Sequence, residues 1–263
     1  MIGAIRTPQD ARWYGVTIGA LVACAWAALA AWGASPFAGL LDHRGIGEGA
    51  LPVSRVVIFV AGWTLMVIAM MLPGSLPLIN LFSRLVSARP DRAGLLGRLI
   101  LGYLGVWGIF GAVAFRGDAY IHAVAARFPE AAEASQWIGV GILLLAGIYQ
   151  VTPLKDMCLT KCRSPYMFLA GHWGGKNAGA DALRLGAQHG LFCIGCCWTL
   201  MLLMFAVGGV NLGWMLTLGA LMAAERSFRW GRRLTIPIGA ALVLAAAALV
   251  WRVPVVMAIF RGS

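Results

Sequence analysis

Seven long apolar runs constrain the fold of this chain more than any other feature. They cover about residues 13–34, 56–82, 96–115, 137–152, 190–207, 211–224 and 235–251. A helix needs roughly 20 apolar residues to cross the hydrocarbon core of a bilayer, and most of the runs are close to that length. With 60% hydrophobic and 12% charged residues, the chain has more apolar surface than one protein core could bury. We therefore expect an all-α polytopic integral membrane protein, with about seven transmembrane helices in one domain over residues 1–263.

The positions of Lys and Arg predict how these helices are oriented. Residues 83–98, 153–189 and 225–233 are rich in Lys and Arg, whereas the opposite loops, 35–55 and 116–136, carry five of the ten acidic residues. Of the 21 Lys and Arg residues, 15 fall on the side of the N-terminus. Because cytoplasmic loops carry the excess of positive charge, we expect a cytoplasmic N-terminus in a multi-pass protein of the bacterial inner membrane. The same loops explain the net charge of +11, so we expect lipid bilayer and no nucleic acid as a partner.

Proline and glycine predict where the runs are interrupted. Pro73 and Pro77 should break or kink the second run, because proline removes a helical hydrogen bond. The sequence Gly-Gly-Val-Asn at 208–211 predicts a tight turn between the fifth and sixth runs. Residues 116–136 are expected to form a separate amphipathic helix on the outer face. Its apolar side would carry Tyr120, Val124 and Phe128.

One imidazole and three thiols lie within residues 189–198, at the start of the fifth run. His189, Cys193 and Cys197 are spaced i, i+4, i+8, so their side chains stack along one face of a helix. Cys196 lies beside Cys193 at i+3. Thiolates with an imidazole are soft ligands that suit Cu(I) or Zn(II). The stripe therefore predicts a metal site, with copper as the first candidate and zinc as the alternative.

A second pair of thiols precedes the stripe in the chain. Residues 154–170 are expected to form a helix on the inner face, with Leu154, Cys158 and Cys162 on one side and a break at Ser164-Pro165. The topology places this pair and the stripe at the same cytoplasmic surface, so we expect all of these thiols to form one or two metal sites. Neighbouring side chains that could add a ligand are Asp156, Met157 and His172.

Two methionines of the second run are further candidate ligands. Met66 and Met70 are spaced i, i+4, with Trp63 on the same face one turn earlier. Thioethers bind Cu(I) and are neutral, so they can occupy a span without the cost of a buried charge. We expect these methionines to face the thiols.

Other residues favour structural roles. Glu225 is expected to pair with a neighbouring arginine, and Cys24 to be a small packing residue of the first run. The sequence has no nucleotide-binding loop, no hydrolase elbow and no paired carboxylates within a span. These absences favour a protein that is not an enzyme, and they leave the question of catalysis open.

The chain resembles a bacterial domain-of-unknown-function family of metal-binding integral membrane proteins, some of whose members are called copper chaperones. The resemblance covers about residues 55–226, and Arg226 stands where the family carries Lys. It rests on Trp63-x-x-Met66-x-x-Ala69-Met70-Met71-x-Pro73, Tyr149-Gln150-x-Thr152-Pro153-Leu154-Lys155-x-x-Cys158-x-x-x-Cys162-Arg163-Ser164-Pro165, His189-Gly190-x-x-Cys193-x-Gly195-Cys196-Cys197-Trp198-x-Leu200-Met201, Asn211-x-x-Trp214-Met215 and Glu225. It implies a membrane protein with a soft-metal site that acts in copper handling or in copper-enzyme maturation.

The expected function is to bind and relay Cu(I), with a copper-dependent membrane or periplasmic protein as a candidate partner. The candidate metal ligands are Cys158, Cys162, His189, Cys193, Cys196, Cys197, Met66 and Met70. A membrane thiol–disulfide oxidoreductase is an alternative, because Cys193-Ile-Gly-Cys196 has the C-x-x-C spacing of redox enzymes. A structural subunit of a membrane complex, in which a metal holds helices together, is a third interpretation.

Overall fold

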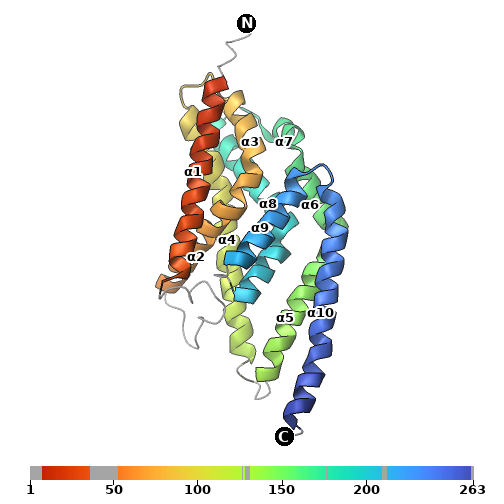
Figure 1. Cartoon of the computed structure of the whole chain (residues 1–263). Helices are drawn as coiled ribbons and strands as arrows, with labels where there is room; N and C mark the ends of the chain where they lie inside the picture. Colours follow the sequence, from red (N-terminus) through yellow and green to blue (C-terminus); the bar gives the residue numbers. More distant parts are fainter. Residues whose placement is uncertain are drawn as a thin grey trace.

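The computed structural model describes residues 8–35, 53–125, 127, 131–175, 177–208 and 212–261. These residues fold into an elongated bundle of ten helices, in which α1 begins at one end and α10 finishes at the other (Figure 1). The helices are α1 (Pro8–Gly33), α2 (Val53–Met70), α3 (Leu72–Leu85), α4 (Arg92–Ala125), α5 (Ala131–Tyr149), α6 (Pro153–Arg163), α7 (Pro165–His172), α8 (Ala178–Gly208), α9 (Leu212–Ser227) and α10 (Gly231–Arg261). The expected all-helical fold is confirmed.

The described helices do not confirm the seven transmembrane spans that the sequence predicts. Four described helices are long and apolar enough to cross a membrane: Val53–Met70, Arg92–Ile121, Ala178–Met204 and Gly231–Trp251. Gly139–Tyr149 and Pro153–Arg163 reach that length only together, as a pair bent by 65°, which would make five. The apolar part of α1 and the whole of α9 are shorter, so the count of seven is not confirmed.

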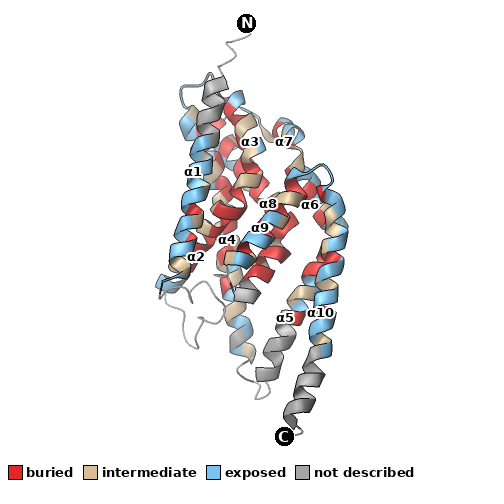
Figure 2. Cartoon of the chain, viewed as in Figure 1, coloured by how far each residue is buried: buried red, intermediate tan, exposed pale blue. Residues whose placement is uncertain are grey.

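The centre of the bundle is built on α4 and α8, which form the most extensive helix pair. Their backbones come close because Gly186 has no side chain. A Cβ at this position would collide with the carbonyl group of Leu99. Small residues at a helix interface permit this approach. Figure 2 shows the buried residues concentrated where α2, α3, α8 and α9 meet. In contrast, α10 lies at the edge of the bundle. Only 11% of its apolar segment is buried inside the protein, compared with 56% for α8.

Two of the three predicted interruptions fall on described residues. The second run breaks at Met71, where α2 ends and α3 begins with Pro73 in its first turn, as predicted. The prediction of a separate helix over 116–136 is wrong for its first part, because residues 116–125 continue α4 without a break. Phe128 and residues 209–211 lie outside the described residues.

The inner-face helix is broken at Ser164 into α6 and α7, as predicted, but its buried face differs from the expectation. Cys158 and Cys162 are buried, whereas Leu154 and Met157 are exposed. Lys155 takes the buried position instead, with none of its surface exposed. The reason is a specific acidic partner, described below.

Candidate metal centre

The predicted stripe on α8 is buried over its whole length. His189, Cys193, Cys196 and Cys197 are each at most 4% exposed. The helix carries them into the centre of the bundle because its neighbours α4 and α6 pack against this part of it. The residue types and the helical spacing therefore place four potential metal ligands in the protein interior.

The turn between α5 and α6 positions the second pair of thiols. The hydroxyl group of Thr152 caps α6 by accepting a hydrogen bond from the backbone N–H of Lys155, and Pro153 occupies the first turn. On the next turns, Cys158 and Cys162 face α8. A Cβ on Gly195 would lie 2.5 Å from the Sγ of Cys158, so the absence of a side chain at this position lets α6 approach α8.

Sulfur atoms from α6 and α8 meet at the centre of the site. The Sγ of Cys162 lies 3.9 Å from the Sγ of Cys196, although 34 residues separate them in the chain. The Sγ of Cys196 also lies 3.2 Å from that of Cys197 and donates a hydrogen bond to the carbonyl of Cys193. We call Cys158, Cys162, Cys193, Cys196 and Cys197 the thiol cluster. The structure thus brings together the two stretches that the sequence singled out.

The cluster can be compared with the geometry that a thiolate-bound metal needs. A metal–sulfur bond of about 2.3 Å with tetrahedral angles puts two sulfurs about 3.8 Å apart. The 3.9 Å between Cys162 and Cys196 fits this value, whereas the 3.2 Å between Cys196 and Cys197 is too short for both sulfurs to bind one ion without moving apart. Across the described ranges, no group of three or more His, Cys, Asp or Glu side chains is already arranged to hold a metal ion. The donor pair that fits is therefore Cys162 with Cys196.

Cys193 is contacted by two polar side chains from other helices. The Oη of Tyr103 on α4 lies 3.2 Å from its Sγ, and the Nη1 of Arg226 on α9 donates a hydrogen bond to it over 3.3 Å. Neither residue is predicted from the sequence to be part of the site. Tyr103 sits in an ordinary apolar run, and Arg226 reads as one of the positive charges that set the topology. Only the packing of α4 and α9 against α8 reveals their role.

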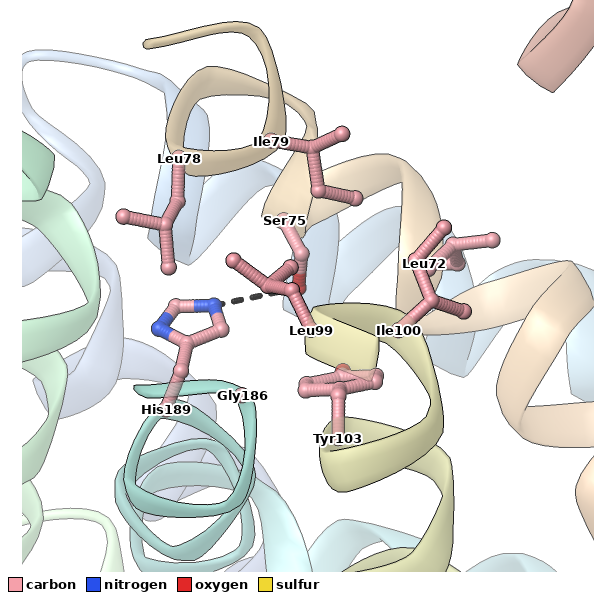
Figure 3. A pocket seen from close by; sticks show the side chains of 9 residues that line it. All are labelled: Leu72, Ser75, Leu78, Ile79, Leu99, Ile100, Tyr103, Gly186 and His189. Carbon is pink, nitrogen blue, oxygen red and sulfur yellow. Dashed lines mark hydrogen bonds between the residues drawn. The ribbon is translucent and has the colours of Figure 1, made fainter. Parts of the chain in front are cut away.

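His189 lies on the same helix as three thiols of the cluster, but its ring contacts other side chains of the described structure. Its Nε2 lies 3.1 Å from the Oγ of Ser75 on α3, and its ring stacks against Tyr103 with centroids 5.6 Å apart. Figure 3 shows these residues around a small pocket between α3, α4 and α8. The Nδ1 of His189 is buried and has no hydrogen-bond partner. A free ring nitrogen is what a metal ligand requires, so the prediction for His189 stands as a prediction.

The predicted methionines are both buried in the core. Met66 is 1% exposed and Met70 is 5% exposed. Met70 packs against Gly219 of α9, where an added Cβ would lie 3.2 Å from its Cε. The neighbouring Met71 is linked to the thiols through Arg226, since its Sδ lies 4.0 Å from the Nη1 of Arg226, the same atom that contacts Cys193. Metal binding by Met66 and Met70 remains a prediction, and Met71 joins them as a candidate.

A buried ion pair fastens α6 to α9 beside the cluster. The Nζ of Lys155 lies 2.8 Å from the Oε2 of Glu225, and both side chains have at most 1% of their surface exposed. Gln150 bridges the pair: its amide donates to Glu225 and its carbonyl oxygen accepts from Lys155. The expected pairing of the Glu225 carboxylate with an arginine is therefore wrong. Arg163 instead donates to the backbone carbonyl of Glu225.

The remaining candidates are exposed or contact other partners. Asp156 forms an exposed ion pair with Arg232, at 2.6 Å. Met157 is exposed, and the Nδ1 of His172 lies 2.7 Å from the carbonyl oxygen of Phe168 in its own helix. Cys24 was expected to be a packing residue, but it is exposed on α1. Exposed Cys24 thus serves as a natural control for the five buried thiols.

The helices and the buried sulfur atoms define an all-helical protein with a thiol-rich interior. Residues 60–249 match the family described as PpoB2, copper chaperone. The chain belongs to this family, which confirms the resemblance noted from its sequence blocks. No curated protein and no solved structure matches the chain. Membership of the family supports a role in copper handling.

Proposed function

We propose that the protein is a membrane copper chaperone that binds Cu(I) through the thiol cluster and passes it to a copper-dependent membrane or periplasmic protein. The observation that carries the proposal is the 3.9 Å distance between the sulfurs of Cys162 and Cys196, buried where α6 meets α8. Cu(I) is a soft ion that thiolates select, whereas a structural zinc site takes four ligands, more than this pair supplies. Cu(I) is therefore the metal that the pair suits best, and zinc is the alternative.

Burial of the site supports a function in retention and transfer. A thiol loses its proton when it binds a metal, and bound thiolates are stabilised by the metal charge inside an apolar interior. Several more sulfur atoms surround the first pair, including those of Cys193 and Cys197. Cu(I) can therefore exchange ligands step by step without leaving a sulfur environment.

The proposed location is the bacterial inner membrane, with the N-terminus in the cytoplasm. Four long apolar helices support a membrane location. The thiol-bearing part of α8 starts near the side where most Lys and Arg residues lie, so the proposal places the cluster towards the cytoplasmic leaflet.

Elemental analysis of the protein purified in detergent tests the proposal. We expect wild type, isolated from copper- and zinc-replete cells under reducing conditions, to carry stoichiometric copper. In Cys162→Ser and Cys196→Ser, bound copper should fall by more than half. Cys24→Ser is the matched control and should keep its copper, because Cys24 is exposed on α1. Wild type without a soft metal would overturn the proposal.

Two further measurements separate the other two interpretations. A thiol–disulfide oxidoreductase would carry no stoichiometric metal and would show a reversible two-electron titration of its thiols. A structural subunit held together by a metal would keep its cellular activity in a Cys193→Ser variant that folds normally. A copper chaperone would lose that activity.

A further inference from the structure

We infer that Arg226 makes the thiol cluster selective for a monovalent soft cation over a divalent one, that is, for Cu(I) over Zn(II). The inference rests on the proposed function and names the feature that determines which metal the cluster holds. It concerns a permanent positive charge in the interior of the protein, contributed by a helix that carries none of the cysteines.

The guanidinium group of Arg226 is held in direct contact with the cluster. Its Nη1 donates to the Sγ of Cys193 at 3.3 Å and to the backbone carbonyl of Met71 at 3.3 Å. Its Nη2 donates to the Oγ of Ser75 at 3.4 Å. Gly74 leaves room for the group, since an added Cβ would lie 2.8 Å from the Cζ of Arg226. The side chain is only 8% exposed, so its orientation is set by these partners.

The charge of Arg226 has no carboxylate partner among the residues that the structure describes. The adjacent acid, Glu225, is already paired with Lys155 at 2.8 Å, and this pair is neutral as a unit. The other contacts of Arg226 are a backbone carbonyl, a hydroxyl group and sulfur atoms. A buried cation needs a compensating negative charge, and the cluster is the group that can supply it.

The metal in the cluster decides how much negative charge is available. Two thiolates with Cu(I) have a net charge of −1, whereas two thiolates with Zn(II) are neutral. Next to Arg226, the copper complex therefore becomes neutral as a whole, and the zinc complex carries +1. For any fixed number of thiolates the copper complex is more negative by one unit. The positive charge thus favours Cu(I) when both metals bind the same set of thiolates.

The size of the effect follows from Coulomb's law. Consider two unit charges about 5 Å apart in an interior with an effective dielectric constant of about 20. Their interaction energy is large enough to change a binding equilibrium by more than about tenfold. We expect removal of the charge to lower the ratio of bound copper to bound zinc by at least about tenfold.

Competition between the two metals tests the inference. Reduced protein in detergent is equilibrated anaerobically with chelator-buffered Cu(I) and Zn(II), and both metals are measured after desalting. Arg226→Gln and Arg226→Met both remove the charge. Should the glutamine variant not fold, the methionine variant replaces it, because methionine is apolar and has a similar volume. Arg226→Lys keeps the charge. Arg232→Gln is the control, because Arg232 lies in an exposed ion pair with Asp156.

The expected result is a shift towards zinc in both neutral variants, with the copper-to-zinc ratio preserved in Arg226→Lys and Arg232→Gln. A gain in zinc separates the charge effect from structural damage, which would reduce both metals. Neutral variants that keep the wild-type ratio, or that lose both metals in proportion, would overturn the inference and leave the proposed function intact. Wild type that binds neither metal would overturn the proposed function itself.

Discussion

The ammonium group of Lys155 and the carboxylate of Glu225 form an ion pair of 2.8 Å in which neither side chain is accessible to solvent. The pair joins the first turn of α6 to the last turns of α9. It therefore fixes the helix that carries Cys158 and Cys162 against the helix that carries Arg226. The two sulfur-bearing stretches and the buried guanidinium depend on this connection for their relative positions.

Breaking the ion pair from one side should be strongly destabilising. Glu225→Gln leaves the charge of Lys155 buried without a partner, a change that typically costs about 3–5 kcal/mol. We expect the midpoint of unfolding in detergent to fall sharply. The double variant Lys155→Met/Glu225→Gln should recover most of the loss, because no charge remains buried. A double variant as unstable as the single one would contradict a role for charge compensation.

The contact between α6 and α8 should depend on the absence of a side chain at position 195. Gly195→Ala places a Cβ 2.5 Å from the Sγ of Cys158, so α6 has to move outwards. We expect weaker Cu(I) binding in a chelator competition, with the helical content unchanged. Gly105→Ala is the matched control, since a Cβ there meets nothing within 4 Å and alanine favours the helix. Equal Cu(I) affinity in the two variants would argue against this contact as part of the site.

The close packing of α4 and α8 should be equally sensitive. Gly186→Val would push its side chain into the carbonyl of Leu99, and such overpacking costs about 1–3 kcal/mol. Thermal unfolding should begin at a lower temperature than in wild type. In Gly97→Ala, by contrast, the added methyl group meets nothing within 4 Å and should be tolerated. A stable Gly186→Val protein would show that the two helices can separate without loss of the fold.

The orientation in the membrane can be measured with reporter fusions. The turn between α3 and α4 contains Arg89 and Asp91, which form an exposed ion pair at 2.9 Å. A periplasmic phosphatase fused in this turn should be inactive, because we expect the turn to lie in the cytoplasm. The same reporter fused after Trp251 should be active. The opposite pattern would contradict the predicted cytoplasmic N-terminus.

The sequence predicted the helices well because apolar runs and helical spacing are local properties. Each of the seven runs lies on one or more helices, and the break near Pro73 occurs where expected. The C-terminal end of α4 was predicted too early in the chain, because charged residues such as Arg116 and Asp118 are typical of a loop at the membrane surface. A helix can continue beyond the apolar region when its backbone hydrogen bonds are satisfied, and α4 does so to Ala125.

The thiols of the candidate site were also predictable, but their polar surroundings were not. The spacing of Cys158 and Cys162, and of Cys193 and Cys197, already indicated which faces of the two helices carry sulfur. Lys155 and Arg226 look like charges of cytoplasmic loops, because burial of a cation depends on a partner distant in the chain. For Lys155 that partner is Glu225, 70 residues away.

X-ray absorption spectroscopy at the copper edge, on Cu(I)-loaded protein, tests the central claim most directly. If sulfur atoms from α6 and α8 hold the metal, the first shell of wild type and of Cys24→Ser will consist of sulfur. Sulfur scattering will then decrease in Cys162→Ser and in Cys196→Ser. A first shell of nitrogen and oxygen only, or a sulfur shell unchanged in both serine variants, would contradict the account.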